Sequence, residues 1–230
     1  MNGDEVPKID DVRETLSSLQ RYKVSVIEPF EADNSLKPKI VWKIDGYIQA
    51  VLYRICDLAE AAINCYETSL FVPASILTRS TMETSAVFFA CKKLATEVLH
   101  KKDIHSLDNM IMKLSFAVGY EDDTLPKAVN VLTHCDRVDR LIPGFRGVYD
   151  NLCEIVHPNY YGTEGFYSRV DKERCCINMS SSPVAVKSLT SSICTALRGS
   201  IYIFEITNDE LKRIRPEVVL LCRELYPDEQ

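Results

Sequence analysis

The end of one predicted helix carries the side chains best suited to chemistry. It reads Glu154-Ile155-Val156-His157-Pro158-Asn159, with a histidine directly before a helix-breaking proline. The imidazole of His157 titrates near physiological pH, so it could act as a general acid or base with Glu154 to orient it. The alternative is structural, with His157 capping the last carbonyl groups of the helix while Asn159 shapes the following turn. The sequence leaves both interpretations open.

Other side chains that could form a binding site share the region of this helix end. Arg146 and Asp150 recur at helical spacing before His157, on the same flank of the helix, and several aromatic residues crowd the neighbouring sequence. We therefore expect a small pocket lined by Arg146, Tyr149, Asp150 and Asn159. Its aromatic side chains could stack on a base or line a ligand site, and packing in the core explains them equally well.

A second unusual feature is the pair Arg79 and Glu83. These are the only charged residues between Leu70 and Cys91, and they lie one helical turn apart. Burying such charges is costly unless other groups pair with them, so we expect partners from another element, with His157 or Asp150 as the residues to supply them. A purely structural ion pair that sets the helix register is the alternative.

Motifs for cofactors and metals are missing from the sequence. It has no glycine-rich phosphate loop, no Walker lysine motif, no His-Glu-x-x-His and no Gly-x-Ser-x-Gly. Cys153 and His157, with His134 and Cys135 elsewhere, lack a recognisable zinc spacing. We therefore expect neither a cofactor nor a bound metal.

Charge and cysteine content narrow the class of protein. The formal net charge of -6 argues against a broad, sequence-independent nucleic-acid surface, although a local basic patch would still permit RNA contact. The nine cysteines are scattered, odd in number and without a Cys-x-x-Cys pair, which indicates free thiols in a reducing compartment. The acidic start of the chain does not resemble a signal peptide. We expect a cytoplasmic protein.

Hydrophobic spacing places these residues in a mainly α-helical fold. The pattern predicts a bundle of about six to eight helices with a small β-hairpin near the C-terminal third. We expect one domain, 1–230, with a peripheral segment (1–38), a helical core (39–158), a hairpin insertion (159–182) and C-terminal helices (183–230). The two hairpin strands are predicted at Phe166 to Val170 and Arg174 to Met179. Leu70 to Cys91 is long enough to span a bilayer, but its two charges predict a buried helix outside any membrane.

Local signals also predict where several helices begin and end. Apolar spacing predicts one long helix from Trp42 and a second from Pro73 to about His100. Asp103 is expected to cap the next helix, and an acidic loop at residues 119–124 is expected before another helix that starts at Leu125. In the C-terminal segment we expect two helices, the last of them at residues 211–225 with an interruption near Pro216.

Two segments carry a resemblance to known proteins. Leu77-Thr78-Arg79-Ser80-Thr81-Met82-Glu83, followed by Tyr149-Asp150-Asn151-Leu152-Cys153-Glu154-Ile155-Val156-His157-Pro158-Asn159, resembles a poorly characterised group of bacterial helical proteins with an Arg-Ser-x-x-Glu helix and a Leu-x-Glu-x-x-His-Pro helix end. That group is distantly similar to the HEPN superfamily, and the match covers roughly residues 42–167. HEPN proteins are helical bundles that often dimerise, and many are metal-independent RNases of toxin-antitoxin and antiviral defence systems.

The resemblance implies a specific chemistry for this chain. Arg146, the nearest preceding arginine, lies too far from His157 for the usual HEPN motif, so Arg79 from another helix would take its place. His157 would then remove the ribose 2′-hydroxyl proton while Arg79 stabilises the phosphorane, with Glu83 and Glu154 orienting them. The competing hypotheses are a non-catalytic module for protein partners, with Arg79, Glu83 and His157 as a structural polar network, and a small-molecule sensor.

Overall fold

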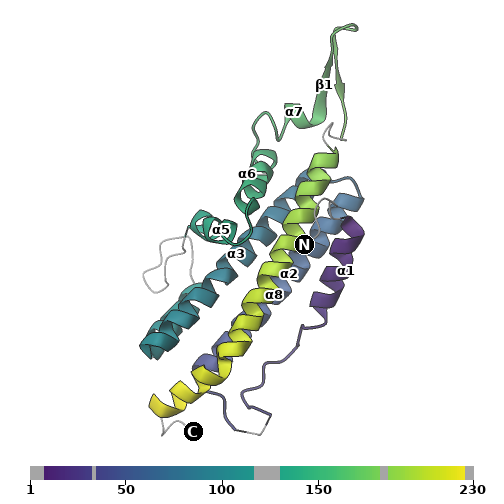
Figure 1. Ribbon diagram of the computed structural model, residues 1–230. Coiled ribbons are helices and arrows are strands. Elements are labelled where there is room, and N and C mark those ends of the chain that lie inside the picture. Colours follow the sequence, from purple (N-terminus) through teal and green to yellow (C-terminus); the bar gives the residue numbers. More distant parts are fainter. Residues whose placement is uncertain (1–7, 33–34, 117–129, 182–185, 226–230) are drawn as a thin grey trace.

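The computed structural model of the protein describes residues 8–32, 35–116, 130–181 and 186–225. Helices make up most of these residues, with a two-stranded antiparallel hairpin late in the chain (Figure 1). This confirms the predicted mainly α bundle and its hairpin. The elements, in chain order, are α1 (Ile9–Gln20), α2 (Lys39–Glu67), α3 (Phe71–Lys101), α4 (Ile104–Phe116), α5 (Val131–Asp139), α6 (Phe145–Val156), α7 (Glu164–Tyr167), β1 (Ser168–Asp171), β2 (Cys176–Met179) and α8 (Val186–Leu225).

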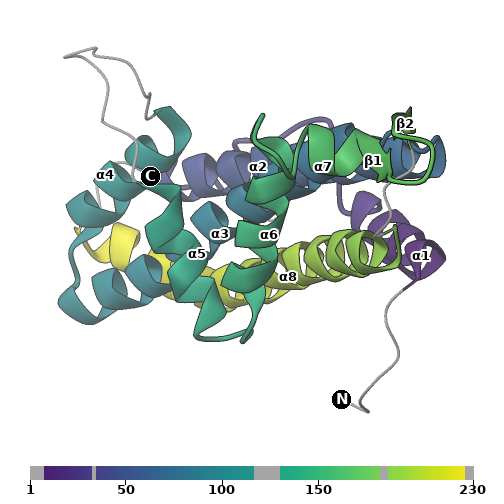
Figure 2. The ribbon, with the colours of Figure 1, turned by 90° about the horizontal axis from the view of Figure 1, so that it is seen from above.

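Helix α3 is the centre of the bundle. It packs along α2 and α8, and α4, α5 and α6 also contact it. Figures 1 and 2 show α2, α3 and α8 as long neighbouring rods, with α5 and α6 laid against α3. Helix α3 is surrounded on several sides, so the hydroxyl groups of its buried serine and threonine side chains need hydrogen-bond partners within the protein. The hydroxyl groups of Ser75 and Thr81, for example, donate to the carbonyls of Phe71 and Leu77 at 2.9 and 2.8 Å.

The first helix belongs to the bundle rather than to a peripheral segment. Val12, Leu16 and Leu19 of α1 are at most 3% exposed, and α1 packs against α2 and α8. These three side chains follow the i, i+4, i+7 spacing of an apolar helix face. The expectation that residues 1–38 are peripheral is therefore wrong for α1.

The C-terminal segment forms one long helix where two were predicted. We expected a break near Pro216, but α8 continues through it. Buried apolar side chains continue on both sides of the proline, with Leu211 and Ile214 before it and Val218 and Leu221 after it. Packing of this continuous apolar face against the bundle outweighs the lost backbone hydrogen bond, a balance that local sequence rules do not contain.

The hairpin is shorter than predicted and is preceded by a short helix. Its strands are β1 and β2, and residues 164–167, partly expected in the first strand, form α7. Cys175 was expected in a strand beside Cys176, but it lies in the connecting turn with a positive φ of 49°. Asp171 explains the tight turn, because its Oδ1 accepts hydrogen bonds from the backbone N–H groups of Glu173 and Arg174 at 3.1 and 3.0 Å.

Two predicted features around α4 and α5 have different outcomes. The predicted cap of α4 is confirmed, since Asp103 Oδ1 accepts from the N–H of Ser106 at 3.0 Å. The predicted acidic loop at residues 119–124, and the predicted start of the next helix at Leu125, lie outside the described residues. Helix α5 is described from Val131, with Asn130 as its cap.

Among the described residues, none of the helices combines the length and apolar composition needed to cross a bilayer.

Candidate functional site

Arg79 and Glu83 lie together on α3, half-buried beneath α6. The Nε atom of Arg79 is 3.3 Å from Oε1 of Glu83, and the two side chains are 24% and 28% exposed. Among the described residues this Nε atom makes no hydrogen bond, so the attraction between the opposite charges carries the contact. The pair predicted as a local i, i+4 interaction is present, in the Arg-then-Glu order that is the weaker one for an isolated helix.

Helix α6 supplies the partners that this pair was expected to need. The hydroxyl of Tyr149 donates to Oε1 of Glu83 at 2.8 Å, and Nη1 of Arg79 lies 4.0 Å from Sγ of Cys153 in a long hydrogen bond. The partners are therefore not His157 or Asp150, which we had expected. We call Arg79, Glu83, Tyr149 and Cys153 the α3–α6 polar cluster.

Burial keeps the neutral members of this region protonated. Tyr149 is only 4% exposed, and this burial, together with its bond to Glu83, raises the pKa of its phenol well above the usual value. Burial likewise raises the pKa of the nearby Cys135 thiol to about 12, with a further contribution from the charge of Glu83. Tyr149 is thus a hydrogen-bond donor rather than a base, and Cys135 is not a thiolate nucleophile at neutral pH.

His157 lies one helical turn beyond the cluster. Glu83 contacts Tyr149 and Arg79 contacts Cys153. Four residues toward the N-terminus of α3 therefore correspond to four residues toward the C-terminus of α6, so the two helices are antiparallel. His157 follows Cys153 by four residues and is the C-cap of α6, beyond the residues that contact Arg79 and Glu83. His157 is exposed, and no hydrogen bond or ion pair joins its side chain to Arg79 or Glu83 within the described part of the chain.

The backbone around His157 forms a tightly closed helix end. His157 has extended backbone angles, and its N–H donates to the carbonyl of Cys153 at 3.0 Å. Asn159 links the helix to the next turn, because its Nδ2 donates to Oε2 of Glu154 at 2.8 Å and its Oδ1 accepts from the N–H of Gly162 at 3.1 Å. Asn159 and Glu154 thus shape the turn, as the structural interpretation of this motif predicts.

Arg146 joins α6 to α5. Its Nε donates to both carboxylate oxygens of Asp150 at 2.8 and 3.0 Å, and its Nη1 lies 2.6 Å from Oδ1 of Asp136. These bonds, to Asp150 first, raise the pKa of Arg146. The four residues predicted to line one pocket, Arg146, Tyr149, Asp150 and Asn159, make separate contacts instead. Arg146 pairs with Asp150, Tyr149 is buried against Glu83, and Asn159 bonds to Glu154.

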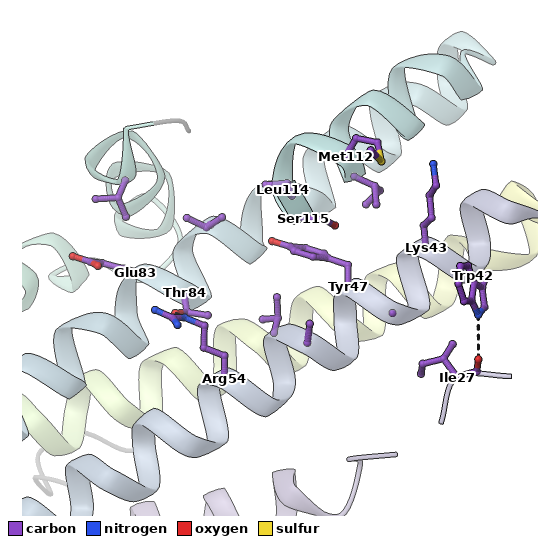
Figure 3. Close-up of a pocket in the computed structure, with 16 residues that line it drawn as sticks. Ile27, Trp42, Lys43, Tyr47, Arg54, Glu83, Thr84, Met112, Leu114 and Ser115 are labelled. Atoms are coloured by element: carbon purple, nitrogen blue, oxygen red, sulfur yellow. Dashed lines mark hydrogen bonds between the residues drawn. The ribbon is translucent and has the colours of Figure 1, made fainter. Parts of the chain in front are cut away.

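An open pocket of about 700 Å³ lies on the other side of Glu83, between α2, α3 and α4. Figure 3 shows Glu83, Thr84 and Arg54 toward one end of the pocket, Tyr47 in the middle, and Lys43 and Trp42 at the other end. Its walls are mostly apolar, and the single tryptophan of the chain, Trp42, lies at its edge with Nε1 donating to the carbonyl of Ile27 at 3.1 Å. The lining residues are Ile27, Trp42, Lys43, Gly46, Tyr47, Ala50, Val51, Arg54, Glu83, Thr84, Val87, Ile111, Met112, Leu114, Ser115 and Val131.

Sequence reasoning missed this pocket and the place of Arg54 in it, and gave no sign that His134 of α5 is buried. Arg54 was not singled out, because a lone arginine on an amphipathic helix is usually a solvated side chain. His134 is 3% exposed, and neither ring nitrogen has a hydrogen-bond partner among the described residues; burial lowers its pKa. The spacing of Tyr149 and Cys153 did carry a signal, since two residues four apart on α6 match Arg79 and Glu83 four apart on α3.

The arrangement has clear chemical limits. In the described ranges, no group of three or more His, Cys, Asp or Glu side chains is placed to hold a metal ion. The acidic and basic members of the α3–α6 polar cluster are paired with one another, and the exposed side chain of His157 has no hydrogen bond or ion pair to them among the described residues. Comparison with protein-family models, curated proteins and solved structures found no match for this chain.

Proposed function

We propose that this protein is a non-catalytic helical binding module whose ligand site is the pocket between α2, α3 and α4. The observation that supports this proposal is the pocket itself, which has a volume of about 700 Å³ and largely apolar walls. Pockets for small ligands commonly have this size and composition, with a few polar groups that orient the ligand. We expect a ligand with an apolar body.

The charged groups of the pocket favour an anionic group on that ligand. Nζ of Lys43 lies 2.5 Å from Oδ1 of Asp108. Glu83 forms an ion pair with Arg79 and accepts a hydrogen bond from Tyr149. Arg54 has a different partner, because its Nε donates to the uncharged hydroxyl of Thr84 at 3.1 Å. Among the described lining residues, Arg54 is thus the charged side chain without an ion pair, and a guanidinium binds carboxylates well.

The α3–α6 polar cluster acts in this proposal as a structural lock. Glu83 lines the pocket and also bonds to α6, so the cluster ties one wall of the pocket to the helix behind it. A catalytic Arg–His pair would need His157 within reach of the guanidinium, whereas the guanidinium of Arg79 is paired with Glu83. A half-buried polar network that fixes helix register needs no substrate.

Trp42 provides a direct test of ligand binding, because it is the single tryptophan and lines the pocket. We expect decanoate, titrated below its micelle concentration, to change the tryptophan fluorescence in a saturable way and to bind more tightly than decanol or decylamine. Gly46→Leu should weaken binding at least about tenfold by filling the pocket, and Arg54→Gln should remove the preference for the carboxylate.

The matched control for this test is Gly46→Ala. A Cβ added at Gly46 meets nothing within 4 Å, so this variant leaves the pocket largely open and should be more stable by about 0.5–1 kcal/mol, since alanine favours helix. Thermal unfolding checks that each variant folds. The proposal fails if decanoate does not bind, or if a folded Gly46→Leu variant binds as tightly as Gly46→Ala.

RNA binding or metal-independent RNA cleavage, as in a bacterial HEPN-like defence or toxin-antitoxin protein, is the second candidate. One observation favours it: the helix end that the resemblance singles out is exposed at His157 and Asn159, beside Tyr160 and Tyr161, which are 65% and 63% exposed. Exposed aromatic rings can stack on single-stranded bases, and an exposed histidine can transfer protons.

This second candidate predicts cleavage of single-stranded RNA in the presence of EDTA. His157→Ala should then slow cleavage by about 100-fold, a typical contribution of a general acid or base. His100→Ala, which changes an exposed histidine in the last turn of α3, is the control and should leave the rate unchanged. If the wild-type protein neither binds nor cleaves the RNA, the ligand-binding module stands without this competitor.

A further inference from the structure

The hairpin projects beyond the end of the bundle (Figure 1), and the side chains on one of its faces are apolar and exposed. The antiparallel register pairs Val170 with Ile177 and Ser168 with Met179, and directly opposed residues share one face of a sheet. Val170, Ile177 and Met179 therefore lie on the same face, and they are 70%, 64% and 71% exposed. A projecting two-stranded hairpin is only marginally stable in isolation, whereas three or more strands form a stable sheet.

On the outer edge of β1, Val170 has backbone groups without a hydrogen-bond partner among the described residues. The N–H of Ser180 donates to the carbonyl of Tyr167 at 2.8 Å, which makes these two residues a hydrogen-bonded pair of the ladder. Hydrogen-bonded and non-bonded pairs alternate along antiparallel strands. The pair Val170 and Ile177 is therefore non-bonded within the hairpin. The N–H and C=O of Val170 point outward from β1, where another strand can bind them.

The side chains that flank Val170 are complementary to their own copies. Arg169 and Asp171 lie on the polar face of the hairpin, on either side of Val170. If β1 of a second copy pairs antiparallel with this strand about Val170, each Arg169 lies opposite Asp171 of the other copy, and the two outward-pointing Val170 residues form a hydrogen-bonded pair. The same pairing about Ile177 on the β2 edge opposes Cys176 and Asn178, which carry no charge.

We propose that two copies of this chain associate through their β1 edges, centred on Val170, to form a four-stranded antiparallel sheet. Two cross-strand Arg169–Asp171 ion pairs set its register, and the apolar stripes of the two hairpins, Val170 and Ile177 from each copy, join across the twofold axis. A symmetric, self-complementary contact of this kind closes on itself as a dimer rather than growing into a filament. This inference is independent of the proposed ligand site.

A pair of proline substitutions tests which edge is used. Val170→Pro removes the outward N–H of β1 but no bond of the hairpin itself, because Val170 belongs to a non-bonded pair. Ile177→Pro does the same on the β2 edge and is the matched control. In sedimentation velocity with a reductant, which excludes disulfides through the exposed Cys175, we expect the full chain and Ile177→Pro to be dimers and Val170→Pro to be a monomer.

A charge reversal tests the register. Arg169→Glu places a carboxylate opposite Asp171 of the second copy twice in each dimer, and we expect the dimer dissociation constant to rise by about tenfold, less at high salt. Circular dichroism and thermal unfolding verify that the bundle is intact. The proposal is overturned by a monomeric wild-type chain, by a dimer that survives Val170→Pro, or by a dimer that only Ile177→Pro dissociates.

Discussion

Glu83→Ala is expected to lower the free energy of unfolding by about 2–3 kcal/mol. The substitution leaves the guanidinium of Arg79 without its ion-pair partner at 3.3 Å and the buried hydroxyl of Tyr149 without its acceptor at 2.8 Å. Both losses occur where α6 packs on α3, at side chains less than a third exposed. Urea denaturation followed by circular dichroism measures the change.

A double-mutant cycle separates the bond of Tyr149 from the remaining effects of Glu83. Tyr149→Phe removes the hydroxyl alone and should cost about 1 kcal/mol, while the double variant with Glu83→Gln should show a coupling energy of similar size. Glu210→Ala is the matched control, because it removes a carboxylate paired with Arg213 within α8, where Arg213 is 62% exposed, and should change stability by less than about 0.5 kcal/mol. A Glu83→Ala variant as stable as this control would contradict a structural lock.

Gly162→Ala is expected to destabilise the closed helix end by about 2–3 kcal/mol. A Cβ added at this position would lie 2.0 Å from the carbonyl oxygen of His157 and 2.6 Å from that of Ile155. Both obstacles are backbone atoms of the end of α6, so a rotamer change cannot relieve the clash. The turn must open, which breaks the bond from Gly162 to Asn159. Chemical denaturation gives the global effect, and hydrogen exchange at residues 157–167 gives the local one.

Gly147→Ala is the matched control for this prediction. Gly147 lies within the same helix, and a Cβ added there meets nothing within 4 Å. The substitution should raise the free energy of unfolding by up to about 1 kcal/mol, because alanine favours helix over glycine. Equal effects of the two substitutions would show that the close approach at Gly162 is not a constraint on the fold.

Local sequence rules were sufficient for the elements whose stability is local. The apolar spacing of α2 and α3, the cap of α4 at Asp103 and the end of α6 before Pro158 all depend on residues within a few turns of one another. The two unusual features, the Arg79 and Glu83 pair and the His157-Pro158-Asn159 helix end, were also recognisable from the sequence. Charged residues are rare in an apolar helix because burying them is costly, so Arg79 and Glu83 stand out. Pro158 restricts the backbone of His157 to extended angles, so it marks the end of the helix.

Tertiary packing decided the points where the predictions differ from the structure. Helix α8 passes Pro216 because the buried residues on either side are held by other helices, and α1 joins the core because α2 and α8 cover its apolar face. A proline rule counts only the lost hydrogen bond, and a periodicity rule does not say which neighbour covers a face. These outcomes depend on contacts between residues far apart in the chain.

The partners of Arg79 and Glu83 show the same division most clearly. The sequence by itself determined that this pair needs help from another helix, since the cost of burying charge does not depend on the fold. The antiparallel register of α6 on α3 decided that Tyr149 and Cys153 provide it and that His157 lies a turn away, exposed. The pocket beside Arg54 likewise exists because three helices meet at one place, a fact of packing that no local pattern contains.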